Sequence, residues 1–418
     1  MPSKGLTNAA LGVPNQPRVD YSIGMVTLRD IEAAQRSIRP RIHKTPLLHS
    51  RSLSMITGAE VFIKAENLQK TGSFKVRGAF NKMSRLGKGR VAAASMGNHA
   101  QAVAFAAKEL GMEALIIMPK SVSTVKEEAT RGYGAKIELH GETFQESLDY
   151  ALSLEGYTFV HAYDDDLIIA GQGTVGLELL EDLDAFDAVV APVGGGGLLA
   201  GIAVAIKESR PSTEVIGVQV HAAPSAFLSF REGSVRSLSP FPSLADGIAV
   251  STVGGRAFSV MQKYVDEMLA VEEDTIAMAI LLFMERTKFV VEGAGAAPLA
   301  ALIENRDYFK GRRVVLIASG GNIDFTVIDK IIYKGLLRSG RILVFEVLAD
   351  DVPGTLQALA GIIAQHRGNI LDVVHDRLQA DLPIGKTRVM FVVETRTRGH
   401  LEEILLDINE RGYEASVR

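Results

Sequence analysis

The stretch Ser73-Phe74-Lys75-Val76-Arg77-Gly78-Ala79 places one lysine between an aromatic side chain and small residues that begin a helix. A lysine held at a helix start among apolar neighbours loses hydration, so its ammonium becomes easier to deprotonate. A neutral amine attacks aldehydes, which makes Lys75 a candidate to form a Schiff base. Phe74 is placed to lie against a planar ring. Taken alone, the pattern is more typical of a solvated surface lysine, so its interpretation depends on three further segments.

The first of these is Ser95-Met96-Gly97-Asn98-His99-Ala100-Gln101, between an apolar strand at 91–94 and a helix at 102–110. A strand, a glycine-containing loop and a helix form an anion-binding arrangement, because the loop amides and the positive helix end face the ligand. A substrate carboxylate suits this loop, and the Asn98 amide can reach a ring hydroxyl. An Asn/Gly turn that caps a helix is the equally consistent alternative.

The second is Val193-Gly194-Gly195-Gly196-Gly197-Leu198, which joins an apolar strand at 188–193 to a helix at 198–207. Residues without side chains let backbone N–H groups surround a phosphate. The pattern is not that of a nucleoside-triphosphate loop, and it is a poor dinucleotide fingerprint. A flexible glycine linker is disfavoured, because strand and helix bound the run tightly.

The third is Ile317-Ala318-Ser319-Gly320-Gly321-Asn322, at the end of an apolar strand over 314–318. Ser319 can donate or accept one hydrogen bond at the mouth of a sheet. Read alone, the segment is as typical of an ordinary strand-end turn.

Together, in motif, order and spacing, the four segments resemble the fold-type II pyridoxal-phosphate enzymes, and within them the threonine/serine dehydratase group, from about Thr27 to Leu337. The resemblance implies pyridoxal 5'-phosphate as cofactor and Lys75 as the catalytic residue that binds it covalently. The cofactor-binding residues that it implies are Phe74 against the ring, Lys75, Asn98 at the 3-hydroxyl, Gly194, Gly195, Gly196, Gly197 and Leu198 at the phosphate, Gly247 and Glu292 in the pocket wall, and Ser319 facing the pyridine nitrogen. The substrate-binding residues that it implies are Ser95, Met96, Gly97, Asn98 and His99.

The same resemblance implies a lyase that converts L-threonine to a keto acid and ammonia by β-elimination, with L-serine as a poorer substrate. L-Serine ammonia-lyase, hydroxyaspartate ammonia-lyase and serine racemase are the rival enzymes. In racemase relatives a serine serves as acid–base at the position of Met96, which cannot transfer a proton. An amino-acid sensor on an inactive enzyme fold is the alternative from another class, and the retained Lys75, Asn98, glycine run and Ser319 argue against it.

Apolar runs alternate with helical patterns from Val61 to Ala318, which favours an α/β fold of parallel sheets covered by helices on both faces. The resemblance divides this region into two parallel-sheet subdomains, as in the tryptophan synthase β-like fold. Ligands of such sheets bind at the carboxyl ends of the strands. Three of the four segments follow predicted strands, and Lys75 begins a helix.

From Arg341 the predicted order changes to strand, helix, strand, strand, helix, strand, which is ferredoxin-like. With Asp351-Val352-Pro353-Gly354 before the first helix and Gly368-Asn369 before the second strand, this region resembles the ACT regulatory domain. That resemblance implies side-by-side pairing and an amino-acid effector near the first loop. Isoleucine and valine are the first candidates, because the family's biosynthetic branch ends in branched-chain amino acids. A dimerisation module without regulation is the alternative. The expected domains are an arm at 1–26, a catalytic domain at 27–337 and an ACT domain at 338–418.

The composition is that of an ordinary globular protein: 418 residues, 47% hydrophobic, 22% charged, with a formal net charge of −4 and no cysteine. It gives no reason to expect a nucleic-acid or membrane partner, and it excludes disulfides and thiolate metal sites. The nine histidines form no metal-ligand cluster, and the stretch from Gln219 to Ser225 lacks the carboxylates through which some relatives bind a cation. The polar N-terminus lacks the apolar centre of a secretory signal. We therefore expect a cytoplasmic protein without a metal. The two resemblances imply a small amino-acid substrate as partner and a homo-oligomer, dimer or tetramer.

Overall fold

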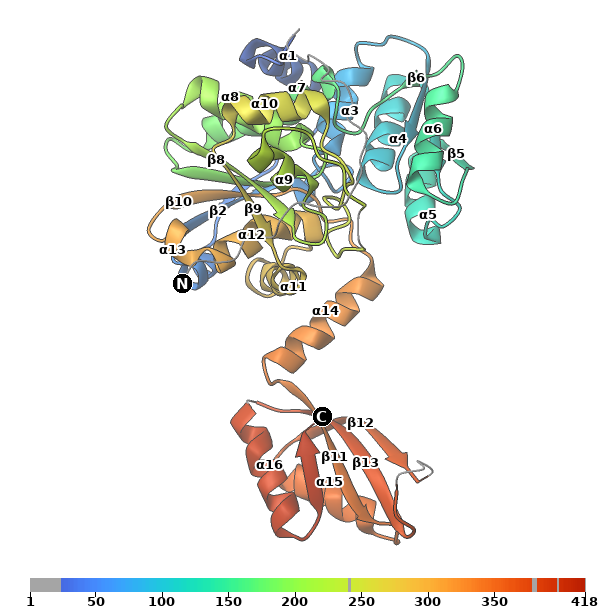
Figure 1. The fold of residues 1–418 in the computed structure, drawn as a ribbon, viewed down its shortest axis with the longest axis vertical. Coiled ribbons are helices and arrows are strands. Elements are labelled where there is room, and N and C mark those ends of the chain that lie inside the picture. The colour runs from blue at the N-terminus through green and yellow to red at the C-terminus, as the bar shows by residue number, and fades with distance from the viewer. Residues whose placement is uncertain (1–23, 240–241, 378–381, 397, 418) are drawn as a thin grey trace, which may run out of the picture.

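The computed structural model describes residues 24–239, 242–377, 382–396 and 398–417. Figure 1 shows an α/β body and a separate C-terminal unit, joined by the helix α14 (Phe325–Arg338). The arm expected over 1–26 lies outside the described residues as far as residue 23. The first helix, α1 (Leu28–Ile38), begins after a capping box in which the side chains of Thr27 and Asp30 each accept a backbone N–H of the other.

A six-stranded sheet forms the centre of the larger part of the body, with strand order β1-β2-β10-β7-β8-β9. Neighbouring strands are parallel, except that β1 is antiparallel to β2. The strands are β1 (Leu47–His49), β2 (Glu60–Ala65), β7 (Ala188–Pro192), β8 (Glu214–Val220), β9 (Glu267–Val271) and β10 (Arg313–Ala318). Alternate side chains enter separate cores on the two faces, as Val189 and Val190 do. Burial on both faces explains why these strands are almost continuously apolar.

Helices cover both faces of this sheet. One face packs against α1, α7 (Asp166–Asp182), α8 (Gly197–Ser209) and α10 (Gly255–Tyr264). The other packs against α2 (Arg51–Thr57), α11 (Glu273–Leu282) and α12 (Gly293–Glu304). The remaining elements are the 3-10 helix η1 (Glu66–Leu68), α9 (Ser225–Glu232), the π-helical turn η2 (Phe283–Thr287) and α13 (Arg306–Phe309).

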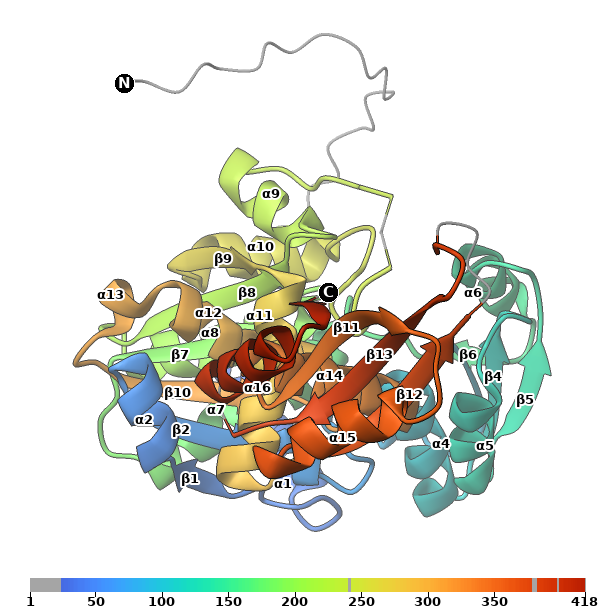
Figure 2. The same cartoon turned by 90° about the horizontal axis from the view of Figure 1, so that it is seen from below.

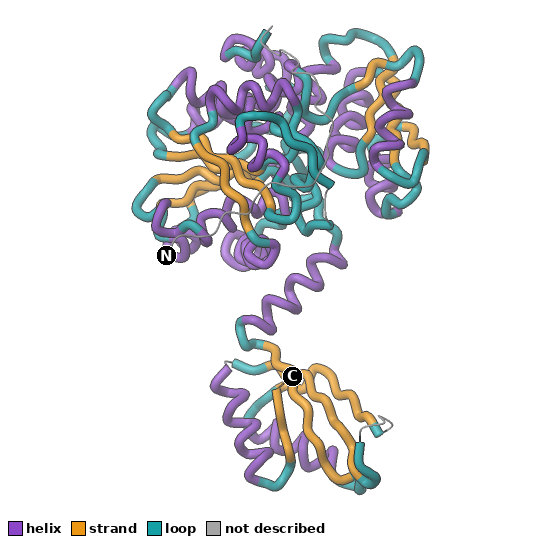
Figure 3. The backbone as a smooth tube through the Cα atoms, in the orientation of Figure 1, coloured by secondary structure: helices purple, strands orange, loops and turns teal. Residues whose placement is uncertain are grey.

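A second, wholly parallel sheet has the order β5-β4-β3-β6. Its strands are β3 (Arg90–Ala94), β4 (Glu113–Met118), β5 (Lys136–Leu139) and β6 (Thr158–Phe159). The helices beside it are α3 (Lys75–Met83), α4 (Asn98–Leu110), α5 (Thr124–Gly132) and α6 (Phe144–Ser153). In Figure 3 the strands of this sheet stand between helices. Because α3 packs against both α4 and α7, it joins the two parts of the body.

The C-terminal unit has the β-α-β-β-α-β order that its sequence predicts, with an antiparallel sheet in the order β12-β13-β11-β14. Its elements are β11 (Ile342–Asp350), α15 (Thr355–Gln365), β12 (Asn369–Asp376), β13 (Lys386–Glu394), α16 (Arg398–Glu410) and β14 (Glu414–Val417). Figure 2 shows α15 and α16 on one face of this sheet. Its core includes the rings of Phe345 and Phe391, whose centroids lie 5.5 Å apart.

The predicted α/β class with parallel sheets, followed by a ferredoxin-like unit, is confirmed. The boundary expected between 337 and 338 falls in the last turn of α14, where Arg338 pairs with Asp274 of α11. Arg341 then pairs with Glu285 at 3.2 Å. In the described part of the chain, no helix combines the length and the apolarity needed to cross a membrane.

Candidate active site

Lys75 is the first residue of α3, and its side chain lies against the loop that follows β6. Its Nζ donates a hydrogen bond to the Ala162 carbonyl oxygen at 3.0 Å and lies 5.2 Å from the centroid of the Phe74 ring. Burial lowers the pKa of Lys75 to about 8, although the carboxylate of Glu292 acts to raise it. Near neutral pH, the neutral fraction of this amine is therefore far larger than that of a solvated lysine.

The Ser319 segment lies directly beside the lysine segment. The Phe74 amide donates to the Ser319 carbonyl oxygen at 3.0 Å, and Ser73 pairs with Gly320 in an antiparallel bridge. The Ser319 side chain is buried. A Cβ on Gly320 would lie 2.3 Å from Oε1 of Glu292, so this close approach requires glycine. The structure thus brings Lys75, Ser319 and Glu292 to one place.

Asn98 begins α4 and joins this group from the smaller sheet. Its Nδ2 donates to Oε1 and Oε2 of Glu292 at 2.8 and 3.0 Å. Burial raises the pKa of Glu292 to about 7, and the hydrogen bond from Asn98 opposes that effect. A Cβ on Gly247 would lie 3.9 Å from Oε1 of Glu292, so Gly247 is a neighbour of the same carboxyl group.

The glycine run at 194–197 connects β7 to α8 in a tight turn. A Cβ on Gly194 would lie 2.8 Å from the Gly247 carbonyl oxygen, and one on Gly195 would lie 2.2 Å from the Tyr163 ring. Gly196 has φ +93° and forms the N-cap of α8, and Leu198 is buried in the first turn. Backbone N–H groups at a helix start, on residues that have no side chains of their own, suit a phosphate.

The proposed substrate segment, residues 95–99, leads into the first turn of α4. The Ser95 hydroxyl accepts the Gly97 amide at 3.3 Å, and the side chain of Met96 is 36% exposed. Nε2 of His99 lies 2.8 Å from the Val160 carbonyl oxygen. Burial lowers the pKa of His99 to about 3, so its ring is neutral and donates its Nε2–H to that carbonyl. His99 therefore braces the loop and adds no positive charge to it.

Sequence reasoning missed the residues after β6. Besides the Ala162 carbonyl, this loop contributes Tyr163, whose ring covers Gly195, and His161, whose Nδ1 accepts the amides of Tyr163 and Asp164 at 3.2 and 2.9 Å. Two amides at Nδ1 leave the ring proton of a neutral imidazole on Nε2. His161, Ala162 and Tyr163 lie just after a parallel strand, and this position is the signal in the sequence that could have indicated them.

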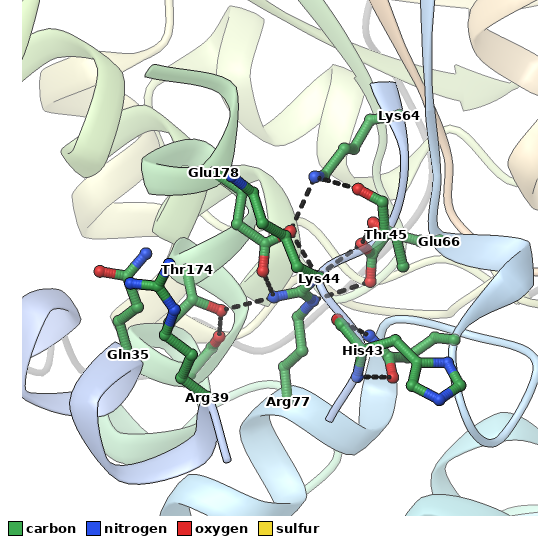
Figure 4. A network of polar contacts seen from close by, with 12 residues as sticks. Gln35, Arg39, His43, Lys44, Thr45, Lys64, Glu66, Arg77, Thr174 and Glu178 are labelled. Atoms are coloured by element: carbon green, nitrogen blue, oxygen red, sulfur yellow. Dashed lines mark hydrogen bonds and ion pairs between the residues drawn. The ribbon is translucent and has the colours of Figure 1, made fainter. Parts of the chain in front are cut away.

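A buried polar network around Arg77 anchors α3 to its neighbouring elements (Figure 4). Arg77 is fully buried and donates to both oxygens of Glu66 at 2.7 and 2.8 Å, to both oxygens of Glu178 at 2.7 and 2.9 Å, and to Thr174 at 3.1 Å. Nζ of Lys64 lies 2.7 Å from Oε2 of Glu178. The network ties the helix of Lys75 to β2, η1 and α7.

These residues fit a phosphorylated aldehyde: an amine of lowered pKa, an amide donor and a glycine turn at a helix start. The buried Ser73 hydroxyl also has no hydrogen-bond partner among the described residues, so a polar group is available beside Lys75. The described ranges contain no cluster of three or more histidine or acidic side chains arranged for a metal ion.

Residues 38–320 match the family described as pyridoxal-phosphate dependent enzyme. The chain belongs to this family, and its cofactor is pyridoxal phosphate.

Among curated relatives, L-threonine ammonia-lyase of Thermotoga maritima is 46% identical over 400 residues, which cover 94% of this chain and 100% of that protein. Among solved structures, a threonine deaminase from T.th. is 44% identical, with a TM-score of 0.69, over 72% of this chain and 99% of that one. Maize serine racemase is 31% identical, with a TM-score of 0.70, over 75% of this chain and 99% of that one.

Proposed function

We propose that this chain is a pyridoxal-phosphate-dependent ammonia-lyase that converts L-threonine to 2-oxobutanoate and ammonia. The observation that carries the proposal is the 46% identity with the L-threonine ammonia-lyase of Thermotoga maritima along that protein's whole length. The group formed by Lys75, Asn98, Glu292 and Ser319 supports it, because the members come from distant segments and meet at one place.

When bound, pyridoxal phosphate withdraws electrons from the α-carbon of an amino acid. Lys75 would hold the cofactor through its amine, and this amine in its neutral form would accept the α-proton of the amino acid. The loop 95–99 binds the substrate carboxylate with backbone N–H groups at the start of α4. Ser319 offers the pyridine nitrogen a hydroxyl and no negative charge. A carboxylate at this position would favour the protonated nitrogen, whereas the serine hydroxyl would leave the nitrogen neutral.

The rival lyases act on L-serine or hydroxyaspartate, which also carry a β-hydroxyl group. Serine racemase is a further candidate because the maize enzyme has a similar fold. Racemisation needs a second acid–base group on the opposite face of the substrate, and the thioether of Met96 cannot transfer a proton. An amino-acid sensor would not need the lowered pKa of Lys75.

The test compares initial rates of the holoenzyme with L-threonine, L-serine and hydroxyaspartate, with detection of keto acid and of D-serine. The variant Lys75→Ala is expected to lose keto-acid formation and covalent cofactor binding while it keeps its fold. Lys82→Ala is the matched control, since it removes a lysine from the same helix that pairs with Asp165 at 2.8 Å. Turnover of L-threonine by the Lys75 variant at the rate of the control would refute the proposal. If the wild-type protein prefers another of these substrates, that substrate takes the place of L-threonine in the proposal.

We also propose that the C-terminal unit binds an amino-acid effector and that the protein is a cytoplasmic homo-oligomer. The ferredoxin-like order of β11 to β14 supports the first part, together with the ACT-like loop from Asp351 to Gly354. Isoleucine and valine remain the first ligands to try. Light scattering with and without each amino acid, alongside initial rates, tests both parts.

A further inference from the structure

The side-chain amide of Asn98 has two chemically different ends. Its Nδ2 can only donate hydrogen bonds and its Oδ1 can only accept them, so the rotamer decides what Asn98 offers to the pocket. In the structure Nδ2 faces the carboxyl group of Glu292 at 2.8 and 3.0 Å, and Oδ1 accepts a hydrogen bond from Nδ2 of Asn322 at 2.7 Å.

The orientation of Asn322 follows from a backbone group. Its Nδ2 lies 2.8 Å from the Thr71 carbonyl oxygen, which has no proton to donate, so the nitrogen of the amide must face it. The second N–H of that nitrogen is then directed at Oδ1 of Asn98, with Oε1 of Gln101 at 3.3 Å as a weaker acceptor. Asn322 therefore donates on both sides, to the Thr71 carbonyl oxygen and to Oδ1 of Asn98. Asn98 in turn donates to Glu292.

The backbone next to Asn322 leaves space for its side chain in this orientation. Gly72 has φ +71°, and a Cβ there would lie 2.4 Å from Oδ1 of Asn322. The Gly321 amide donates to the Gly72 carbonyl oxygen at 2.9 Å, which holds the two segments together. Asn322 thus lies between the loop that leads to Lys75 and the start of α4.

We propose that Asn322 is a positioning residue, which holds Asn98 with its N–H group, and not its carbonyl, toward the cofactor. The inference rests on the proposed function, in which Asn98 contacts the ring oxygen of pyridoxal phosphate. Asn322 itself acts through Asn98. Without Asn322, Oδ1 of Asn98 loses its hydrogen-bond donor, and the carboxyl group of Glu292 is left to hold the amide through Nδ2.

The test uses Asn322→Asp, which keeps the size of the side chain and removes both N–H donors, and Asn322→Ala as a second variant. Asn305→Asp is the matched control: Nδ2 of Asn305 also donates to a backbone carbonyl, that of Ala301 at 3.0 Å, in another part of the body. The dissociation constant of pyridoxal phosphate is measured by titration of the cofactor-depleted protein, together with the pH titration of the visible absorption of the holoenzyme.

Both Asn322 variants are expected to weaken cofactor binding about tenfold or more and to move the midpoint of the absorption titration, whereas the control changes neither. The double variant Asn98→Ala/Asn322→Asp is expected to bind the cofactor no more weakly than Asn98→Ala alone, because Asn322 acts through Asn98. Circular dichroism identifies a variant that has lost its fold, and the alanine variant then decides the result.

The inference is overturned if the double variant loses cofactor affinity by the product of the two single-variant factors. It is also overturned if both Asn322 variants bind the cofactor with wild-type affinity. An Asn98→Ala variant with unchanged cofactor binding would overturn it too, since Asn98 would then not contact the cofactor. Failure of the proposed function gives a different result. If Asn98 and Asn322 are coupled in cofactor binding but the wild-type protein does not turn over L-threonine, the positioning role stands and only the substrate assignment is wrong.

Discussion

Replacing Arg77 by methionine is predicted to destabilise the folded protein by about 3–5 kcal/mol. The five N–H groups of its guanidinium are all used, on Glu66, Glu178 and Thr174. Methionine fills part of the space but cannot pair with the buried carboxylates of Glu66 and Glu178. Among the described residues of this network, the ammonium of Lys64, which lies beside Glu178, is then the cation left for both. Removing one partner of a buried ion pair costs this much because the other partner stays desolvated.

The effect also has a predicted pH dependence. Burial acts to raise the pKa of Glu66, but the Arg77 guanidinium, with help from Lys64 and Thr45, outweighs it and holds that pKa below the ordinary 4.5. The stability from this pair is therefore present above the ordinary carboxyl pKa and is lost as the pH falls through the lowered one. Without Arg77, burial raises the pKa of Glu66, and the variant loses stability as the pH rises. The difference from wild type is thus largest near neutral pH and shrinks in acid.

The measurement is urea unfolding of the holoenzyme, near neutral pH and in mild acid, followed by far-UV circular dichroism. Arg131→Met is the matched control, because Arg131 is 58% exposed and pairs with Glu127 on the surface of α5, where about 1 kcal/mol or less is expected. Adding Glu66→Gln to Arg77→Met should restore part of the lost stability, since a neutral amide costs less to bury than a carboxylate. The reasoning is refuted if Arg77→Met unfolds at the urea concentration of the control at both pH values.

Three further predictions concern the site, and a fourth concerns the C-terminal unit. Competitive acetylation of the cofactor-free protein should give Lys75 a titration midpoint of about 8, and a midpoint near the ordinary 10.5 would contradict the effect of burial. Ser319→Asp should increase the cofactor converted to its amine form relative to keto acid formed, and an unchanged ratio would show that Ser319 does not face the ring nitrogen. Gly195→Ala should abolish tight cofactor binding, since its Cβ would lie 2.2 Å from the Tyr163 ring, and fluorescence titration with the cofactor checks this. Deleting residues 341–418 should leave a folded core without any response to isoleucine or valine, and a response kept in full would place the effector site in the core.

Local pattern alone predicted the elements that carry the site. The apolar runs before Asn98, Gly194 and Ser319 are β3, β7 and β10, and the helix expected at Lys75 is α3. These elements are predictable because a parallel strand buried on both faces is continuously apolar, and because glycine marks the turns after it. The short edge strand β1 lacks that apolar signal, since two of its three side chains are exposed, and it was not predicted.

The class of fold followed from the sequence by itself, because apolar runs and glycine turns show within short windows. The cofactor followed from it too, because four short motifs resemble those of a known family. Tertiary structure alone decided which distant groups meet. Glu292 lies 194 positions from Asn98, Asn322 lies 224 positions from it, and the Ala162 carbonyl lies 87 positions from Lys75. The lowered pKa of Lys75 and the polarity of the Asn98 amide exist only after folding, because desolvation and hydrogen-bond direction depend on groups that the chain brings together across two sheets.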